Sequence, residues 1–203
     1  MKKFGAILLA LTAILTSLTL TGCKGPMTDA DAVEILTPLL ERDVELNRYI
    51  WGDGFTTRET PKEDEKVSDT CQYYRVSEDA PYHSTAALRA DIEEVYSTIL
   101  ATAICDYAFV NTGDTMARFC DFKQNNQVAD LQIDITLNHP PYKLDAVMYP
   151  STAVVKRSTT TIIEAELEYS IGKDGEHKIM EIRALKQDGK WKLDTHTWAG
   201  AVG

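Results

Sequence analysis

The chain has 203 residues, of which 44% are hydrophobic, and it carries 31 acidic against 21 basic residues, for a net charge of −10. Lys2 and Lys3 are the only charged residues among the first 22, so residues 23–203 carry a net charge of −12, which argues against binding nucleic acid or anionic lipid through a basic patch. The hydrophobic share is too high for a disordered chain, and the length suits one domain or two small lobes.

Residues 1–22 have the layout of an export signal. Lys2 and Lys3 form a basic start, and residues 4–22 carry no charge and are mostly apolar. A membrane-spanning helix is the alternative. It is disfavoured because threonine and serine residues dilute a run that barely reaches spanning length.

The end of this segment, Leu20-Thr21-Gly22-Cys23, resembles the lipobox of bacterial lipoproteins. The resemblance implies that the thiol of Cys23 receives a diacylglycerol group and that cleavage makes it the first residue of the mature chain. The protein is then expected at the extracytoplasmic face of the cell membrane, held by its lipid anchor, with residues 23–27 as a tether and residues 28–203 as a single domain.

The first helix is predicted over residues 28–51, because apolar residues recur there with helical spacing behind Thr28 as N-cap. Pro38 removes one backbone donor and is expected to kink this helix. Gly52 and Gly54 end it.

Two aromatic residues, Trp51 and Phe55, flank these glycines. They are interpreted as a plug of the core. The alternative is an aromatic lip at a ligand or partner surface, joined by Tyr73 and Tyr74 of a predicted strand at 71–76. These four residues are the candidate binding residues.

A second helix is predicted over residues 84–106, capped by Ser84. Its expected buried face comprises Leu88, Ile92, Val95, Ile99 and Ala103.

The pattern then changes to that of strands: 117–122, 128–135, 153–156, 161–171, 178–187 and 190–197, with hairpin signals at Asn125-Asn126 and Asp188-Gly189. The proline-containing segment 138–151 is expected to be irregular. Helices followed by strands predict an α+β fold in which two helices pack on an antiparallel β-meander, cystatin-like or NTF2-like. Two lobes divided near 138–151 are the alternative.

Three cysteines remain after Cys23: Cys71, Cys105 and Cys120. They are interpreted as buried thiols, and the alternative is one disulfide in any of three pairings. Their spacing is not that of a zinc site, and neither a metal nor another cofactor is predicted.

Sequence templates for common catalytic sites are absent, so an enzyme is not predicted. Asp194 and His196 share one face of the last predicted strand, but they are interpreted as a polar strand face rather than a catalytic dyad. Glu164, Glu166 and Glu168 form an acidic row on the sheet. It is interpreted as a solvated face paired with Arg183, Lys178 or Lys186, and the alternatives are a cation site or a contact for a basic partner. Ile163, Ala165, Leu167 and Tyr169 are expected to face the core.

Several patches resemble surface lipoproteins of clostridia and their relatives: residues 46–55, residues 74–76 followed by 88–97, and the closing hairpin 186–194. The layout is more distantly similar to the IseA-type inhibitors of DL-endopeptidases, exported proteins that bind and block cell-wall hydrolases. The resemblance implies a non-enzymatic binding module with an envelope protein as partner, and it assigns no site residues.

Two other functions stay open. An NTF2-like fold can form a cup for a small molecule or a reaction, in which case a concave pocket with converging polar groups is expected. The other open function is a structural role as a surface lipoprotein.

Overall fold

The computed structural model describes residues 27–52, 54–58, 73–110, 117–134 and 146–198. Cys23, Cys71, the predicted export signal and most of the tether lie outside the described residues. The described residues form three α-helices and two antiparallel sheets, so the predicted α+β fold is confirmed.

Helix α2 spans Asp29–Ile50 and begins as the sequence predicts. The side chain of Thr28 accepts a hydrogen bond from the backbone N–H of Asp31, whose carboxylate accepts one from the backbone N–H of Thr28 in return. This reciprocal capping box satisfies two donors that a helix start leaves without partners. The helix continues through Pro38.

The predicted helix over 84–106 is two helices, α3 (Thr85–Val95) and α4 (Thr98–Phe109). Tyr96 between them is extended, and the side chain of Ser97 accepts from the N–H of Leu100 to begin α4. The break changes the phase of the apolar stripe. Leu88, Ile92 and Val95 are buried as expected, but Ile99 is 83% exposed and Ala103 is exposed, so the predicted face is wrong beyond the break.

One sheet has three strands in the order β1-β3-β2. They are β1 (Tyr73–Arg75), β2 (Phe119–Gln124) and β3 (Gln127–Asp134). Asn125 and Asn126 have φ of 53° and 62° in the turn between β2 and β3, which is the conformation that a two-residue hairpin requires.

The other sheet has five strands in the order β4-β6-β7-β8, and β5 also pairs with β6. They are β4 (Ala146–Met148), β5 (Val154–Ser158), β6 (Ile162–Ile171), β7 (His177–Gln187) and β8 (Lys190–Leu193). Strand β4 lies within the segment expected to be irregular, and a 3₁₀ turn, Pro150–Thr152, begins at the end of that segment. That expectation is wrong for 146–148, and residues 138–145 lie outside the described residues.

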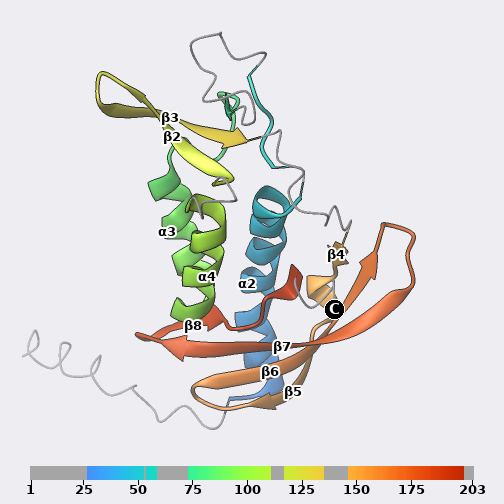
Figure 1. Ribbon diagram of the computed structural model, residues 1–203. Coiled ribbons are helices and arrows are strands. Elements are labelled where there is room, and N and C mark those ends of the chain that lie inside the picture. The colour runs from blue at the N-terminus through green and yellow to red at the C-terminus, as the bar shows by residue number, and fades with distance from the viewer. Residues whose placement is uncertain (1–26, 53, 59–72, 111–116, 135–145, 199–203) are drawn as a thin grey trace, which may run out of the picture.

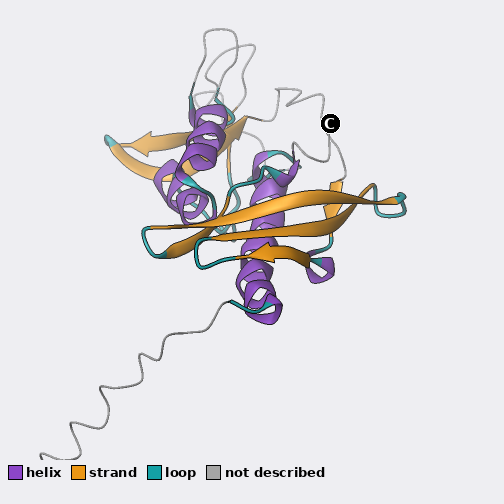
Figure 2. Ribbon diagram, turned by 90° about the horizontal axis from the view of Figure 1, so that it is seen from below, coloured by secondary structure: helices purple, strands orange, loops and turns teal. Residues whose placement is uncertain are grey.

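The two sheets lie at opposite ends of the helices (Figure 1). The five-stranded sheet curls, as in NTF2-like folds, and its strands run across α2, which contacts β5 and β8 (Figure 2). Ile163, Ala165, Leu167 and Tyr169 of β6 are buried, as their alternation predicts. One cluster of buried side chains includes residues of all three helices and of both sheets.

Candidate functional site

The chain turns sharply where α2 ends, and glycine is required for this turn. The backbone N–H of Gly54 donates to the carbonyl of Arg48 at 3.2 Å. Gly54 has a φ of 76°, and a Cβ at this position would lie 2.4 Å from Cδ1 of Ile133. The absence of a side chain therefore lets the backbone approach β3 and directs the next residue, Phe55, toward the three-stranded sheet.

Phe55 belongs to a cluster of aromatic rings at this end of α2. Its ring stacks on that of Tyr49 with centroids 4.4 Å apart, and the rings of Tyr82 and Phe119 meet it edge-on at 5.9 and 5.7 Å. Phe55 is 7% exposed, whereas Tyr49 is only partly buried. Phe55 thus fills the core, as the sequence favours, and the partly exposed ring of Tyr49 extends the aromatic cluster to the protein surface.

The other candidate binding residues lie in different surroundings. Trp51 packs on the ring of Tyr107 with centroids 4.1 Å apart and is partly buried. Tyr73 is 3% exposed, and Tyr74, its neighbour on β1, is partly buried. An exposed aromatic lip made of all four residues is therefore not formed, because Phe55 and Tyr73 are in the protein interior.

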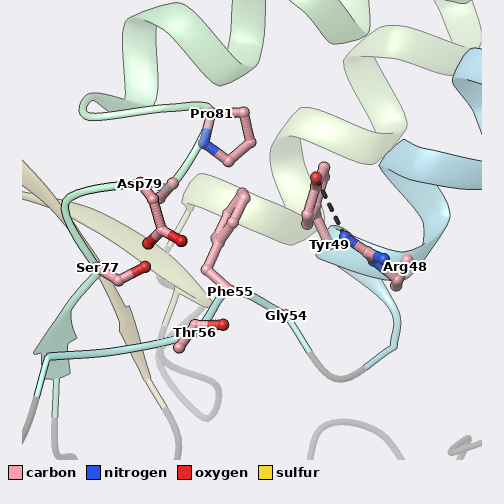
Figure 3. Close-up of a pocket in the computed structure, with 9 residues that line it drawn as sticks. Arg48, Tyr49, Gly54, Phe55, Thr56, Ser77, Asp79 and Pro81 are labelled. Atoms are coloured by element: carbon pink, nitrogen blue, oxygen red, sulfur yellow. Dashed lines mark hydrogen bonds between the residues drawn. The ribbon is translucent and has the colours of Figure 1, made fainter.

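A pocket of about 510 Å³ lies beside Tyr49 and Phe55. In Figure 3, Asp79 and Ser77 lie on one side of the Phe55 ring, and Tyr49 and Arg48 lie on the other. The residues that line the pocket are Arg48, Tyr49, Gly54, Phe55, Thr56, Ser77, Asp79, Ala80 and Pro81.

The two sides of the pocket carry opposite charges. The guanidinium carbon of Arg48 lies 5.0 Å from the centre of the Tyr49 ring, and its Nη2 donates to the Tyr49 hydroxyl at 3.3 Å. Across the pocket, hydrogen bonds from the Ser77 side chain and from the backbone N–H of Asp79 itself lower the pKa of the Asp79 carboxyl group. Asp79 is therefore a carboxylate at neutral pH.

Backbone hydrogen bonds hold the two chain segments of the pocket together. The N–H of Ser77 donates to the carbonyl of Thr56 at 2.8 Å, and that of Arg58 to the carbonyl of Arg75 at 2.9 Å. Thr57 and Val76 form an isolated antiparallel bridge between these bonds.

A buried carboxylate that no sequence pattern indicated, Asp130 of β3, ties the segments that form the pocket to that strand. Asp130 is 2% exposed. Its Oδ2 lies 2.7 Å from Nη2 of Arg58, and its Oδ1 lies 2.9 Å from Nδ1 of His83. Arg58 follows one wall of the pocket and His83 follows the other, so the pocket is held by side chains that do not line it.

The suggested dyad of Asp194 and His196 does not form on one strand, because β8 ends at Leu193. The carboxylate of Asp194 pairs with Nη2 of Arg183 at 2.7 Å. The ring of His196 lies 5.1 Å from that of Trp51, and burial lowers its pKa.

The acidic row on β6 is paired with basic groups, as its interpretation as a solvated face requires. Glu166 lies 3.0 Å from Nζ of Lys156 and Glu164 lies 3.8 Å from Arg157, both on β5. Glu168 lies 3.1 Å from His177. The expected partner Arg183 is opposite Glu164 in the register but pairs with Asp194, so the predicted choice of partners is wrong.

Cys105 and Cys120 are not joined to each other. Cys105 is buried, as a small hydrophobic residue would be, and Sγ of Cys120 lies 3.5 Å from Oε1 of Gln132. The pairings that involve Cys71 lie outside the described residues. Among the described residues, no group of three or more His, Cys, Asp or Glu side chains is arranged to hold a metal ion.

The chain matches no protein-family model and no curated protein. None of the helices in the described part of the chain combines the length and the apolar character needed to cross a bilayer.

Proposed function

We propose that this protein is a lipid-anchored binding module at the extracytoplasmic face of the cell membrane, and that it binds its ligand without a catalytic step. The preformed pocket at the end of α2 carries this proposal, because its walls are fixed by backbone pairing and by Asp130. A site that is ordered before its ligand arrives loses less entropy on binding. The lipobox at Cys23 supports the location.

A cell-wall hydrolase is the proposed protein partner. The layout similar to the IseA-type inhibitors supports this class of partner. So does the net charge of −12 on residues 23–203, since an acidic surface accelerates the encounter with a basic enzyme.

The experiment combines the lipidated protein in liposomes with a purified basic DL-endopeptidase and measures the rate of cell-wall peptide hydrolysis. We expect hydrolysis to slow as the protein concentration rises, and the effect to weaken at high ionic strength, because salt screens charge attraction. An equally acidic unrelated protein on the same liposomes is the control. Unchanged hydrolysis, or equal slowing by the control protein, would contradict a hydrolase partner.

Small-molecule binding is the second candidate function, and the pocket itself supports it. A volume of about 510 Å³ lies within the range of roughly 300–1,000 Å³ that is common for small-molecule sites. The lining includes the polar side chains of Arg48, Ser77 and Asp79. The pocket lies at the end of α2 beside the three-stranded sheet, not in the concave face of the curled sheet.

A further inference from the structure

The pocket at the end of α2 has a separate charged group on each side of an aromatic wall. Arg48 supplies a guanidinium on the side of Tyr49, and Asp79 supplies a carboxylate on the side of Ser77 (Figure 3). Neither group is paired with the other in an ion pair, although both line the same space. The two groups thus present opposite charges to one space, as a ligand with one charge of each sign requires.

We infer that this pocket binds a small zwitterion that carries a primary ammonium and a carboxylate, that is, a free amino acid or a short peptide with both termini free. The inference rests on the proposed role as a binding module and names the chemistry of the ligand.

Arg48 is suited to the carboxylate. Its guanidinium has five N–H donors in a planar fork, and one contact with the Tyr49 hydroxyl leaves most of them for a ligand. Its position over the Tyr49 ring, 5.0 Å from the ring centre, restrains the side chain before a ligand arrives. A restrained guanidinium binds a carboxylate through two parallel hydrogen bonds.

Asp79 is suited to the ammonium. The side chain of Ser77 and the backbone N–H of Asp79 both donate to its carboxylate. A carboxylate has about four lone-pair sites, so acceptor capacity remains for a charged N–H donor.

The surface between the two charges suits a small organic body. Tyr49 and Phe55 offer stacked rings, and Ala80 and Pro81 offer aliphatic contacts. The volume of about 510 Å³ admits a few residues of a peptide and excludes a folded domain.

Calorimetric titration of the lipidated protein in nanodiscs tests the inference with alanine, alanylalanine, N-acetyl-alanylalanine and alanylalanine amide. We expect alanine or alanylalanine to bind, and each blocked dipeptide, which lacks one charge, to bind about tenfold more weakly than the better of the two. Tighter binding of alanine identifies a free amino acid as the ligand, and tighter binding of alanylalanine identifies a peptide. No binding of either up to about 10 mM, or equal binding of the blocked forms, overturns the inference.

Two variants assign the charges. Arg48→Gln is expected to weaken binding of the unblocked ligand about tenfold. It should leave binding of the amide, which has no carboxylate, unchanged. Asp79→Asn is expected to weaken binding of the unblocked ligand and to leave binding of the N-acetyl form unchanged. Arg157→Gln and Asp174→Asn, exposed residues outside the pocket, are the matched controls. Equal effects of pocket and control variants would overturn the assignment.

The two tests fail independently. A lack of zwitterion binding leaves the hydrolase proposal intact, and unchanged cell-wall hydrolysis leaves the zwitterion site intact.

Discussion

Asp43 is a carboxyl group in the protein interior, at the point where α2 meets the α3–α4 junction and the C-terminal segment. It is 1% exposed, and its oxygens accept hydrogen bonds from the Tyr96 hydroxyl at 2.8 Å and the Thr197 hydroxyl at 2.7 Å. Nδ2 of Asn47 donates to the same Thr197 hydroxyl at 2.8 Å. Burial raises the pKa of Asp43 to about 6, although these hydrogen bonds act in the opposite direction.

The raised pKa of Asp43 predicts a specific pH dependence of stability. Its pKa is 3.8 when unperturbed and about 6 in the folded protein, so between these values the folded state binds more protons than the unfolded state, and lowering the pH stabilises the fold. At about 1.4 kcal/mol per pKa unit, the contribution of Asp43 is ~2 kcal/mol between pH 7 and pH 4.

Urea unfolding of the wild type and of Asp43→Asn across this range measures the effect. We expect the difference between their free energies of unfolding to change by ~2 kcal/mol in favour of the wild type as the pH falls. A constant difference would show that Asp43 does not titrate in this way.

Gly54 offers a second test of a single position. Gly54→Ala combines an unfavourable φ of 76° with a contact of 2.4 Å to Ile133, whereas Gly172→Ala has a φ of 77° and open space. Both variants incur backbone strain of about 1–2 kcal/mol. We expect Gly54→Ala to lose a further ~1–3 kcal/mol from overpacking, as measured by urea unfolding. Equal losses would mean that β3 moves aside at no cost.

The junction between α3 and α4 shows how one local element is decided by contacts with a distant one. Tyr96 forms a bridge with Leu193, and the N–H of Ser97 donates to the carbonyl of Leu193 at 2.7 Å. These bonds to the end of β8 replace the helical ones that a continuous helix would make. The chain therefore leaves the helix at Tyr96 and starts a new one behind Ser97.

This break predicts opposite results for two isoleucines that the helical pattern treats alike. Ile92 is fully buried and Ile99 is 83% exposed. We expect Ile92→Ala to lower the free energy of unfolding by about 2–5 kcal/mol, because it leaves a cavity. Ile99→Ala should change it by no more than about 0.5 kcal/mol. Similar losses of stability in both variants would indicate that Ile92 and Ile99 share one buried face of a continuous helix, which would contradict the break.

The described residues share one buried cluster, although their strands are divided between two sheets. Leu131 of β3 and Leu167 of β6 are both fully buried members of that cluster, with the helices between the sheets. Packing of this kind links the stability of one sheet to that of the other and favours a single domain over two lobes.

We accordingly expect one thermal unfolding transition by calorimetry. Leu131→Ala and Leu167→Ala, in different sheets, should each lower the midpoint of that same transition, at a cost of about 2–5 kcal/mol. Two transitions, each sensitive to one variant only, would establish two lobes.

The proposed anchor concerns the location of the entire molecule. Cys23→Ser should prevent acylation, because the hydroxyl does not replace the thiol as the acceptor in the lipobox. Two acyl chains give stable attachment, so without them the protein should leave the membrane fraction. Mass spectrometry and membrane fractionation provide the measurement. Full lipidation and membrane attachment of the variant would contradict the assignment.

Much of the secondary structure was predictable because its signals are local. The cap at Thr28, the turn at Asn125-Asn126 and the alternation on β6 each depend on neighbours in the chain. The site was predictable only in part. The glycine-rich turn and Phe55 could be recognised in the sequence. Arg48 and Asp79, however, carry no pattern that separates them from other surface charges. Asp130 lies on a strand whose polar residues suggest that it is exposed to solvent.

The division follows from the range of the interactions. Helix ends, hairpin turns and the alternation of buried residues are each signalled within a few neighbouring residues. The sequence alone therefore specified the α+β class and most element positions. The break at Tyr96, the buried carboxyl of Asp43 and the pocket between Arg48 and Asp79 depend on residues 31 to 154 positions apart. Such contacts exist only after the chain has folded, since their partners are chosen by packing and not by spacing along the sequence.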